Sequence, residues 1–131
     1  MSKVEVDSIK GKISLSFPIN ISKFNRKGCY VGKVFVPITI NNFSNQKINS
    51  LFKGKDGLYI SYRLKKKDGS EFKNFEYNLS PISRDVKPKC KNNELMVIKI
   101  PNRSGTYHII ASLYYKNALL ATSEKHTIIV R

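Results

Sequence analysis

Residues 105–116 read Gly-Thr-Tyr-His-Ile-Ile-Ala-Ser-Leu-Tyr-Tyr-Lys. Side chains at every second position point to the same side of an extended chain, so this stretch predicts a β-strand with two different faces. The two rows are Tyr107, Ile109, Ala111 and Leu113 on one side, and His108, Ile110, Ser112 and Tyr114 on the other. The first row is suited to a core, and the second mixes aromatic and polar groups that suit a surface.

The same alternation recurs in other segments separated by turns rich in Gly, Pro and Asn. The predicted strands are residues 12–19, 33–41, 58–65, 71–77, 94–100, 105–116 and 125–131. Asp68-Gly69 is a hairpin signal that pairs residues 58–65 with residues 71–77, and Pro37 indicates a strand edge or a bulge. The pattern predicts an all-β protein, a β-sandwich of about seven to eight antiparallel strands.

Length and composition indicate one folded domain. The chain has 131 residues, of which 40% are hydrophobic and 25% charged, which is enough apolar material for one core. Residues 1–22 are expected to be an N-terminal extension or strand, and residues 23–131 the sandwich. The start of the chain has no apolar segment typical of a signal peptide, and no stretch is long and apolar enough for a membrane-spanning helix. We therefore expect a cytoplasmic location.

The charge is strongly positive and leaves two interpretations open. Lys and Arg total 24 against 9 Asp and Glu, a formal net charge of +15. Such a surplus favours an anionic partner, or it only keeps a Lys-rich domain soluble. Lys outnumbers Arg by 19 to 5, whereas Arg is better suited to reading phosphates and bases, so specific nucleic-acid binding is not expected.

No pattern of an active site or cofactor site stands out. The nine carboxylates are scattered, and no Gly-rich phosphate loop or nucleophile elbow is present. His108 and His126 could face each other on adjacent strands, yet no third metal ligand is evident. Cys29 and Cys90 are expected to be free thiols, although a disulfide between them remains open. We expect no catalytic residues, no metal and no cofactor.

One sheet face is the candidate binding surface. The strands at residues 58–65 and 105–116 are expected to be neighbours, with their outward side chains on one face. A Tyr ring presents an apolar face to sugar C–H groups, and Arg or Lys beside it can pair with a carboxylate. Contact with a glycan, contact with a protein and plain solvent exposure all remain open for this face. The candidate carbohydrate-binding residues are Tyr59, Arg63, Lys65, His108, Ser112 and Tyr114.

Several motifs resemble one known family. They are residues 36–44 (VPITINNFS), residues 58–64 (LYISYRL) with Asp68-Gly69, residues 82–88 (ISRDVKP), and residues 98–101 (IKIP) with 104–107 (SGTY). Together they resemble the immunoglobulin-like sandwich domains attached to bacterial polysaccharide-assembly proteins, which occur on some glycosyltransferases and on the ATP-binding subunits of O-antigen ABC exporters.

The resemblance implies a non-catalytic, carbohydrate-binding module that recognises a bacterial surface polysaccharide of O-antigen or capsule type during assembly or export. It also implies a parent glycosyltransferase or exporter subunit at the inner face of the membrane, and dimers that exchange a strand from residues 1–22. The alternative is a protein-interaction or spacer domain of a larger polysaccharide-assembly enzyme.

Overall fold

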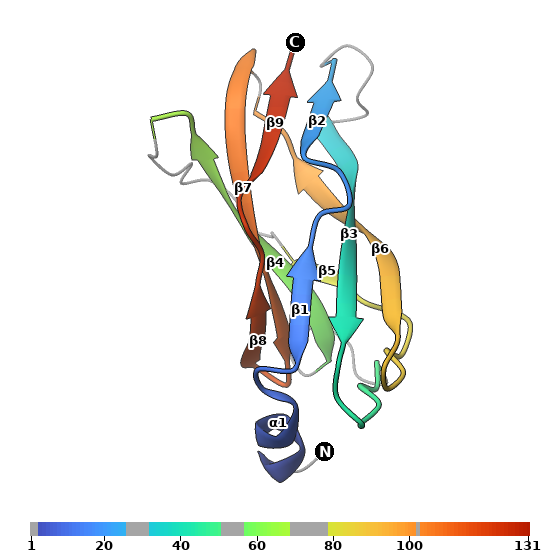
Figure 1. The fold of residues 1–131 in the computed structure, drawn as a ribbon. Helices are drawn as coiled ribbons and strands as arrows, with labels where there is room; N and C mark the ends of the chain where they lie inside the picture. The colour runs from blue at the N-terminus through green and yellow to red at the C-terminus, as the bar shows by residue number, and fades with distance from the viewer. Residues whose placement is uncertain (1–2, 26–31, 51–56, 69–78, 102) are drawn as a thin grey trace.

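A computed structural model describes residues 3–25, 32–50, 57–68, 79–101 and 103–131 (Figure 1). These residues form one short helix, α1 (Lys3–Ile9), and nine strands. The strands are β1 (Ile13–Ser16), β2 (Ile21–Phe24), β3 (Lys33–Asn42), β4 (Leu58–Lys66), β5 (Leu79–Pro81), β6 (Lys91–Lys99), β7 (Gly105–Tyr115), β8 (Ala118–Thr122) and β9 (His126–Val130).

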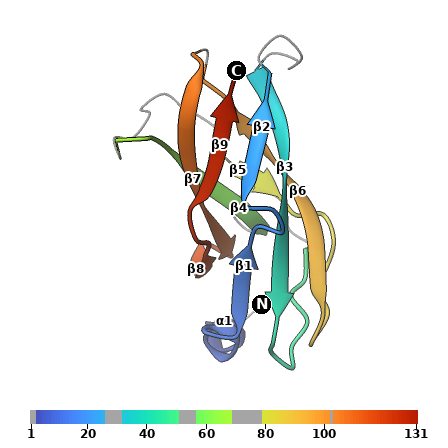
Figure 2. The ribbon, with the colours of Figure 1, turned by 45° about the horizontal axis from the view of Figure 1, so that its top comes forward.

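The strands form two sheets that pack face to face. The three-stranded sheet has the order β1-β3-β6, and the six-stranded sheet has the order β2-β9-β7-β4-β5 with β8 also paired to β7. Figure 2 shows β3 and β6 on one side of the molecule and β7 and β9 on the other. All pairs are antiparallel except β2 with β9, which is parallel. The prediction of antiparallel pairing throughout is wrong for this one pair.

The core lies between the sheets and is built from the predicted inward rows. In β7 the row of Tyr107, Ile109, Ala111 and Leu113 is buried, as the alternation predicts. The row of Leu58, Ile60, Tyr62 and Leu64 is buried beside it in β4, and the other sheet contributes the buried row of Val34, Val36, Ile38 and Ile40 in β3. Each large apolar side chain removed from water contributes about 1.5–3 kcal/mol, so these rows hold the two sheets together.

The first predicted strand, residues 12–19, is shorter than expected, and a second strand that was not predicted follows it in the other sheet. Residues 13–16 pair with β3, and after Phe17 the chain crosses over so that residues 21–24 pair with β9. Pro18 lies in the crossing, where its missing N–H ends the ladder. Residues 1–22 therefore supply α1, β1 and the start of β2, and β1 pairs with β3 of its own chain.

This topology is that of an immunoglobulin-like β-sandwich. Strands β1, β3 and β6 occupy the places of A, B and E, and β4, β7 and β9 those of C, F and G. Tyr107, near the start of β7, is 4% exposed, and its hydroxyl donates a hydrogen bond to the Arg103 carbonyl oxygen at 2.7 Å. A Tyr bonded back to the chain just upstream at this corner is a hallmark of such sandwiches.

Some elements differ from the sequence prediction. The alternation did not reveal α1, β5 and β8, which are short, and β2 was hidden behind Pro18. The predicted strand at residues 71–77 lies outside the described residues. The ladder between β1 and β3 ends at Thr39, so among the described strands β3 has a neighbour on one side only at Pro37, as the prediction of an edge there requires.

Candidate binding face

The six predicted site residues lie on one face of the six-stranded sheet. Strands β4 and β7 are hydrogen-bonded neighbours, as expected, and their register sets Tyr59 opposite Tyr114 and Lys65 opposite His108. The outward positions between these two pairs are Ser61 opposite Ser112 and Arg63 opposite Ile110. Tyr114 is the sixth residue after His108, so the face is about 20 Å long at about 3.4 Å per residue. We call these eight residues the β4–β7 face.

The two tyrosines stack on each other at one end of this face. The ring centroids of Tyr59 and Tyr114 lie 5.2 Å apart, with an angle of 11° between the ring planes. Tyr59 is 8% exposed, whereas Tyr114 is half-buried. Burial, and next the proximity of Tyr114, raises the pKa of Tyr59. Tyr114 is therefore the more accessible ring for a ligand, and Tyr59 supports it from the side.

The other end of the face carries a cluster of positive charge. His108 is half-buried, and burial is the main reason that its pKa is lowered. The ammonium groups of Lys125 and Lys67 lower it further, and Lys65 lies directly across the ladder. Among the described residues of the β4–β7 face there is no carboxylate. This end of the face is therefore electropositive and suited to an anionic group.

Sequence reasoning did not include Lys67 and Lys125 in the site. Lys67 lies in the turn after β4, and Lys125 directly precedes β9. Strand β9 pairs with β7 so that Thr127 lies opposite His108, which brings Lys125 close to the same histidine. The pairing of β7 with β9 would have indicated Lys125, but the alternation of side chains within one strand does not reveal which strand lies beside it.

The two histidines do not face each other. His126 lies opposite Ile109, whereas His108 lies opposite Thr127, so the two rings are on opposite faces of the sheet. His126 is 1% exposed, its Nε2 is 2.7 Å from the Ser22 hydroxyl, and its ring stacks on Phe17. The possibility of a histidine pair is therefore wrong. In the described part of the chain, no three His, Cys, Asp or Glu side chains come together as metal ligands.

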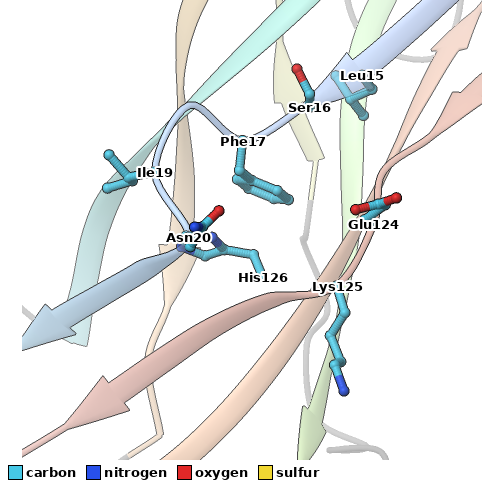
Figure 3. A pocket seen from close by; sticks show the side chains of 8 residues that line it. All are labelled: Leu15, Ser16, Phe17, Ile19, Asn20, Glu124, Lys125 and His126. Atoms are coloured by element: carbon cyan, nitrogen blue, oxygen red, sulfur yellow. The ribbon is translucent and has the colours of Figure 1, made fainter.

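A cavity of about 260 Å³ lies beside His126, where the chain crosses between the sheets (Figure 3). Phe17 lines one wall, and Glu124 and Lys125 line another. The Lys125 side chain extends away from Phe17 in this view. The Nδ1 atom of His126 makes no hydrogen bond of good geometry to the described residues, and it is also closed off from water. A ligand in this cavity would therefore meet the outside of the Phe17–His126 stack rather than that nitrogen.

Of the two cysteines, Cys90 lies in the part of the chain that the structure describes. Cys90 is an exposed free thiol that directly precedes β6. Cys29 lies outside the described residues.

Comparisons with known proteins assign the chain to no family. No family model matches the chain, and no curated protein matches it. Among solved structures, the alkylpurine DNA glycosylase AlkC of Pseudomonas fluorescens, bound to DNA with an abasic site analog, matches 98% of this chain and 33% of its own, with 7% identity and a TM-score of 0.49. The ASH/PapD-like domain 7 of human CEP192 matches 100% of this chain and 89% of its own, with 13% identity and a TM-score of 0.38. At these values, neither similarity bears on what the chain binds.

The described residues contain no helix that is long and apolar enough to cross a membrane.

Proposed function

We propose that this chain is a non-catalytic binding module whose β4–β7 face contacts an acidic glycan. The observation that carries the proposal is the electropositive end of this face, where Lys65, Lys67 and Lys125 surround His108 without a carboxylate on the face itself. A uronic acid or another carboxylate-bearing sugar carries the negative charge that can pair with these ammonium groups. The motifs that resemble polysaccharide-assembly domains agree with a bacterial surface glycan as the ligand.

The aromatic end of the face supports contact with sugar rings. Tyr114 is half-buried and offers part of its ring and a hydroxyl, and its stacking on Tyr59 restricts the ring to one orientation. A face of about 20 Å along the strand accommodates several linked sugars, with the charged unit at His108 and an uncharged one at Tyr114. The hydroxyls of Ser61 and Ser112 lie between the two ends.

Calorimetric titration with acidic oligosaccharides tests this proposal. Oligomers of alginate and hyaluronate are suitable probes, and dextran oligomers of equal length are the neutral control. We expect binding of the acidic probes only, weakened as salt is raised. The double variant Lys65→Glu/Lys125→Glu should bind at least about tenfold more weakly, a loss of about 1.4 kcal/mol.

The control variant must change the net charge equally at exposed positions that do not belong to the β4–β7 face. Lys10→Glu/Lys87→Glu does this, because Lys10 follows α1 and Lys87 lies between β5 and β6, both exposed. If both double variants weakened binding equally, the loss would be due to the overall charge of the protein, and a localised site would be refuted. Absence of heat with every acidic probe would refute the proposal as a whole.

A further inference from the structure

A second surface lies on the outer face of the three-stranded sheet, and it carries apolar side chains that are exposed to water. Phe35 and Leu95 are 63% and 62% exposed, and Val97 is 37% exposed. The register of β3 with β6 sets Phe35 opposite Val97 and Pro37 opposite Leu95, so these four side chains form one continuous row pair. We call them the β3–β6 apolar patch.

The patch arises because, in the middle of β3 and β6, the side chains on both faces of the sheet are apolar. In β3 the inward residues Val34 and Val36 are buried, and Phe35 lies between them on the outer side. In β6 the inward residues Met96 and Ile98 alternate with Leu95 and Val97 in the same way. An antiparallel sheet with one face in water normally carries polar residues on that face. Contiguous exposed apolar residues on a small domain mark an interaction surface.

The rim of the patch is positively charged. Lys33 and Lys99 lie opposite each other at one end, and Lys91 lies at the other end of β6, all three exposed. The remaining outward positions of the described strands β1, β3 and β6 are neutral, namely Ser14, Ser16, Thr39, Asn41 and Asn93. Glu94 is on the inward phase of β6 and is held by Arg84 at 2.6 Å. The patch therefore has an apolar centre and a cationic rim without a carboxylate among its described residues.

Among the described strands, β6 is an outer strand of this sheet, and two amides on its outer side already have hydrogen-bond acceptors. The Val97 amide donates to the Ser80 hydroxyl at 3.1 Å, and the Lys99 amide donates to the Tyr62 hydroxyl at 3.0 Å. Both acceptors come from the six-stranded sheet, so these two edge donors are already satisfied. A partner would therefore meet the flat face of the sheet rather than extend it.

We propose that the β3–β6 apolar patch docks a protein partner whose contact surface has an apolar centre bordered by Asp and Glu. The cationic rim selects this chemistry, and an apolar core with a charged border is the usual anatomy of such interfaces. A second copy of this chain is disfavoured, because it would bring another +15 and the same lysines to the contact. A lipid surface is disfavoured, because the polar side chains of Asn41 and Asn93 lie on the same face and would have to leave water together with the apolar row.

The docking face is independent of the proposed glycan site. It lies on the three-stranded sheet, whereas the β4–β7 face belongs to the six-stranded sheet. One surface can therefore hold a ligand while the other holds the module to its partner.

Site-specific photo-crosslinking of the natural full-length protein, in the cells that make it, tests the proposal. A benzoylphenylalanine residue replaces Leu95, and the matched control carries it in place of Lys23, which is exposed on β2 of the other sheet. We expect a discrete adduct with another protein from position 95 and none from position 23. In the background Lys33→Glu/Lys99→Glu, with an unchanged melting temperature, the adduct should fall at least about tenfold, as expected when charge complementarity is reversed.

The purified partner then provides the second readout. It should bind the unmodified protein in a salt-sensitive manner, and Leu95→Ser should weaken that binding at least about tenfold without lowering the melting temperature. A crosslink to a second copy, a crosslink to lipid, no crosslink, or a crosslink indifferent to the charge reversal would each overturn the proposal.

Discussion

At the scale of single residues, Asn42 explains one motif of the sequence. The stretch 36–44 ends a strand with Asn-Asn-Phe-Ser, and Asn42 is the buried member of the pair, 1% exposed. Its Nδ2 donates to the Gln46 carbonyl at 2.7 Å and also reaches the Val86 and Lys87 carbonyls. Its Oδ1 accepts from the Ser44 amide and hydroxyl. One side chain thus holds the turn after β3 to the segment that precedes β6.

Replacing Asn42 with Ala should lower the free energy of unfolding by about 3 kcal/mol, because several buried carbonyl and amide groups lose their partner at once. The neighbouring Asn41→Ala is the matched control, since Asn41 is half-buried on the outer side of β3, and it should cost no more than about 0.5 kcal/mol. Chemical denaturation of both variants measures the difference. Equal costs would show that the turn does not depend on this network.

His126 should make the fold sensitive to mild acid. Burial lowers the pKa of His126, and the nearby Ile19 carbonyl opposes this only in part. The unfolded chain keeps the ordinary value of about 6.5 and takes up the proton first, so the free energy of unfolding falls as pH drops below about 6.5. Denaturation between pH 7.5 and pH 5 should show this loss, and His126→Gln should flatten it. His108→Gln is the control and should flatten it less, because His108 is only half-buried. An unchanged slope in His126→Gln would contradict the assignment.

At the scale of elements, the alternation of side chains predicts the long strands well. Strands β3, β4, β6, β7 and β9 were all located within a few residues, because each buries one row and leaves the other outside. The strand order of a sandwich, rather than the alternation, predicts that β4 and β7 are neighbours, and this prediction is confirmed. The short strands β2, β5 and β8 could not be found, since their pairing depends on distant neighbours rather than on their own pattern.

The candidate site could be predicted only in part for the same reason. The outward rows of β4 and β7 were identified residue by residue, yet Tyr59 is buried between Tyr114 of β7 and Pro81 of β5, neighbours that no single strand specifies. The β3–β6 apolar patch did leave a signal, because Val34-Phe35-Val36 and Leu95-Met96-Val97 are apolar in both phases. A strand with one face in water normally carries polar residues on that face, so three consecutive apolar residues indicate that another surface covers it.

The capped edge of β6 is testable as an element. Tyr62→Phe removes the hydroxyl that accepts the Lys99 amide, so hydrogen exchange at Lys99 should accelerate at least about tenfold, while exchange at Met96, in the same strand, is unchanged. Amide exchange followed by NMR measures both positions in one sample. Equal acceleration at both would indicate global destabilisation instead of an opened edge.

At the scale of the whole molecule, the sandwich separates two surfaces of different character. The six-stranded sheet presents the β4–β7 face with its tyrosine pair and its cationic end, and the three-stranded sheet presents the β3–β6 apolar patch. The rigid core between them lets each surface keep its shape without support from a ligand. This arrangement suits a module that holds a glycan on one side and its protein partner on the other.

The most direct test of this account is the amide chemical-shift map of the isotope-labelled protein during titration with an acidic oligosaccharide. We predict that the largest shifts run along the outer positions of β4 and β7 from Lys65 to Tyr114, and that the pKa of His108 rises when the ligand's carboxylate is bound. Shifts confined to β3 and β6, or no saturable shifts with any acidic oligosaccharide, would contradict the assignment of the β4–β7 face as the glycan site.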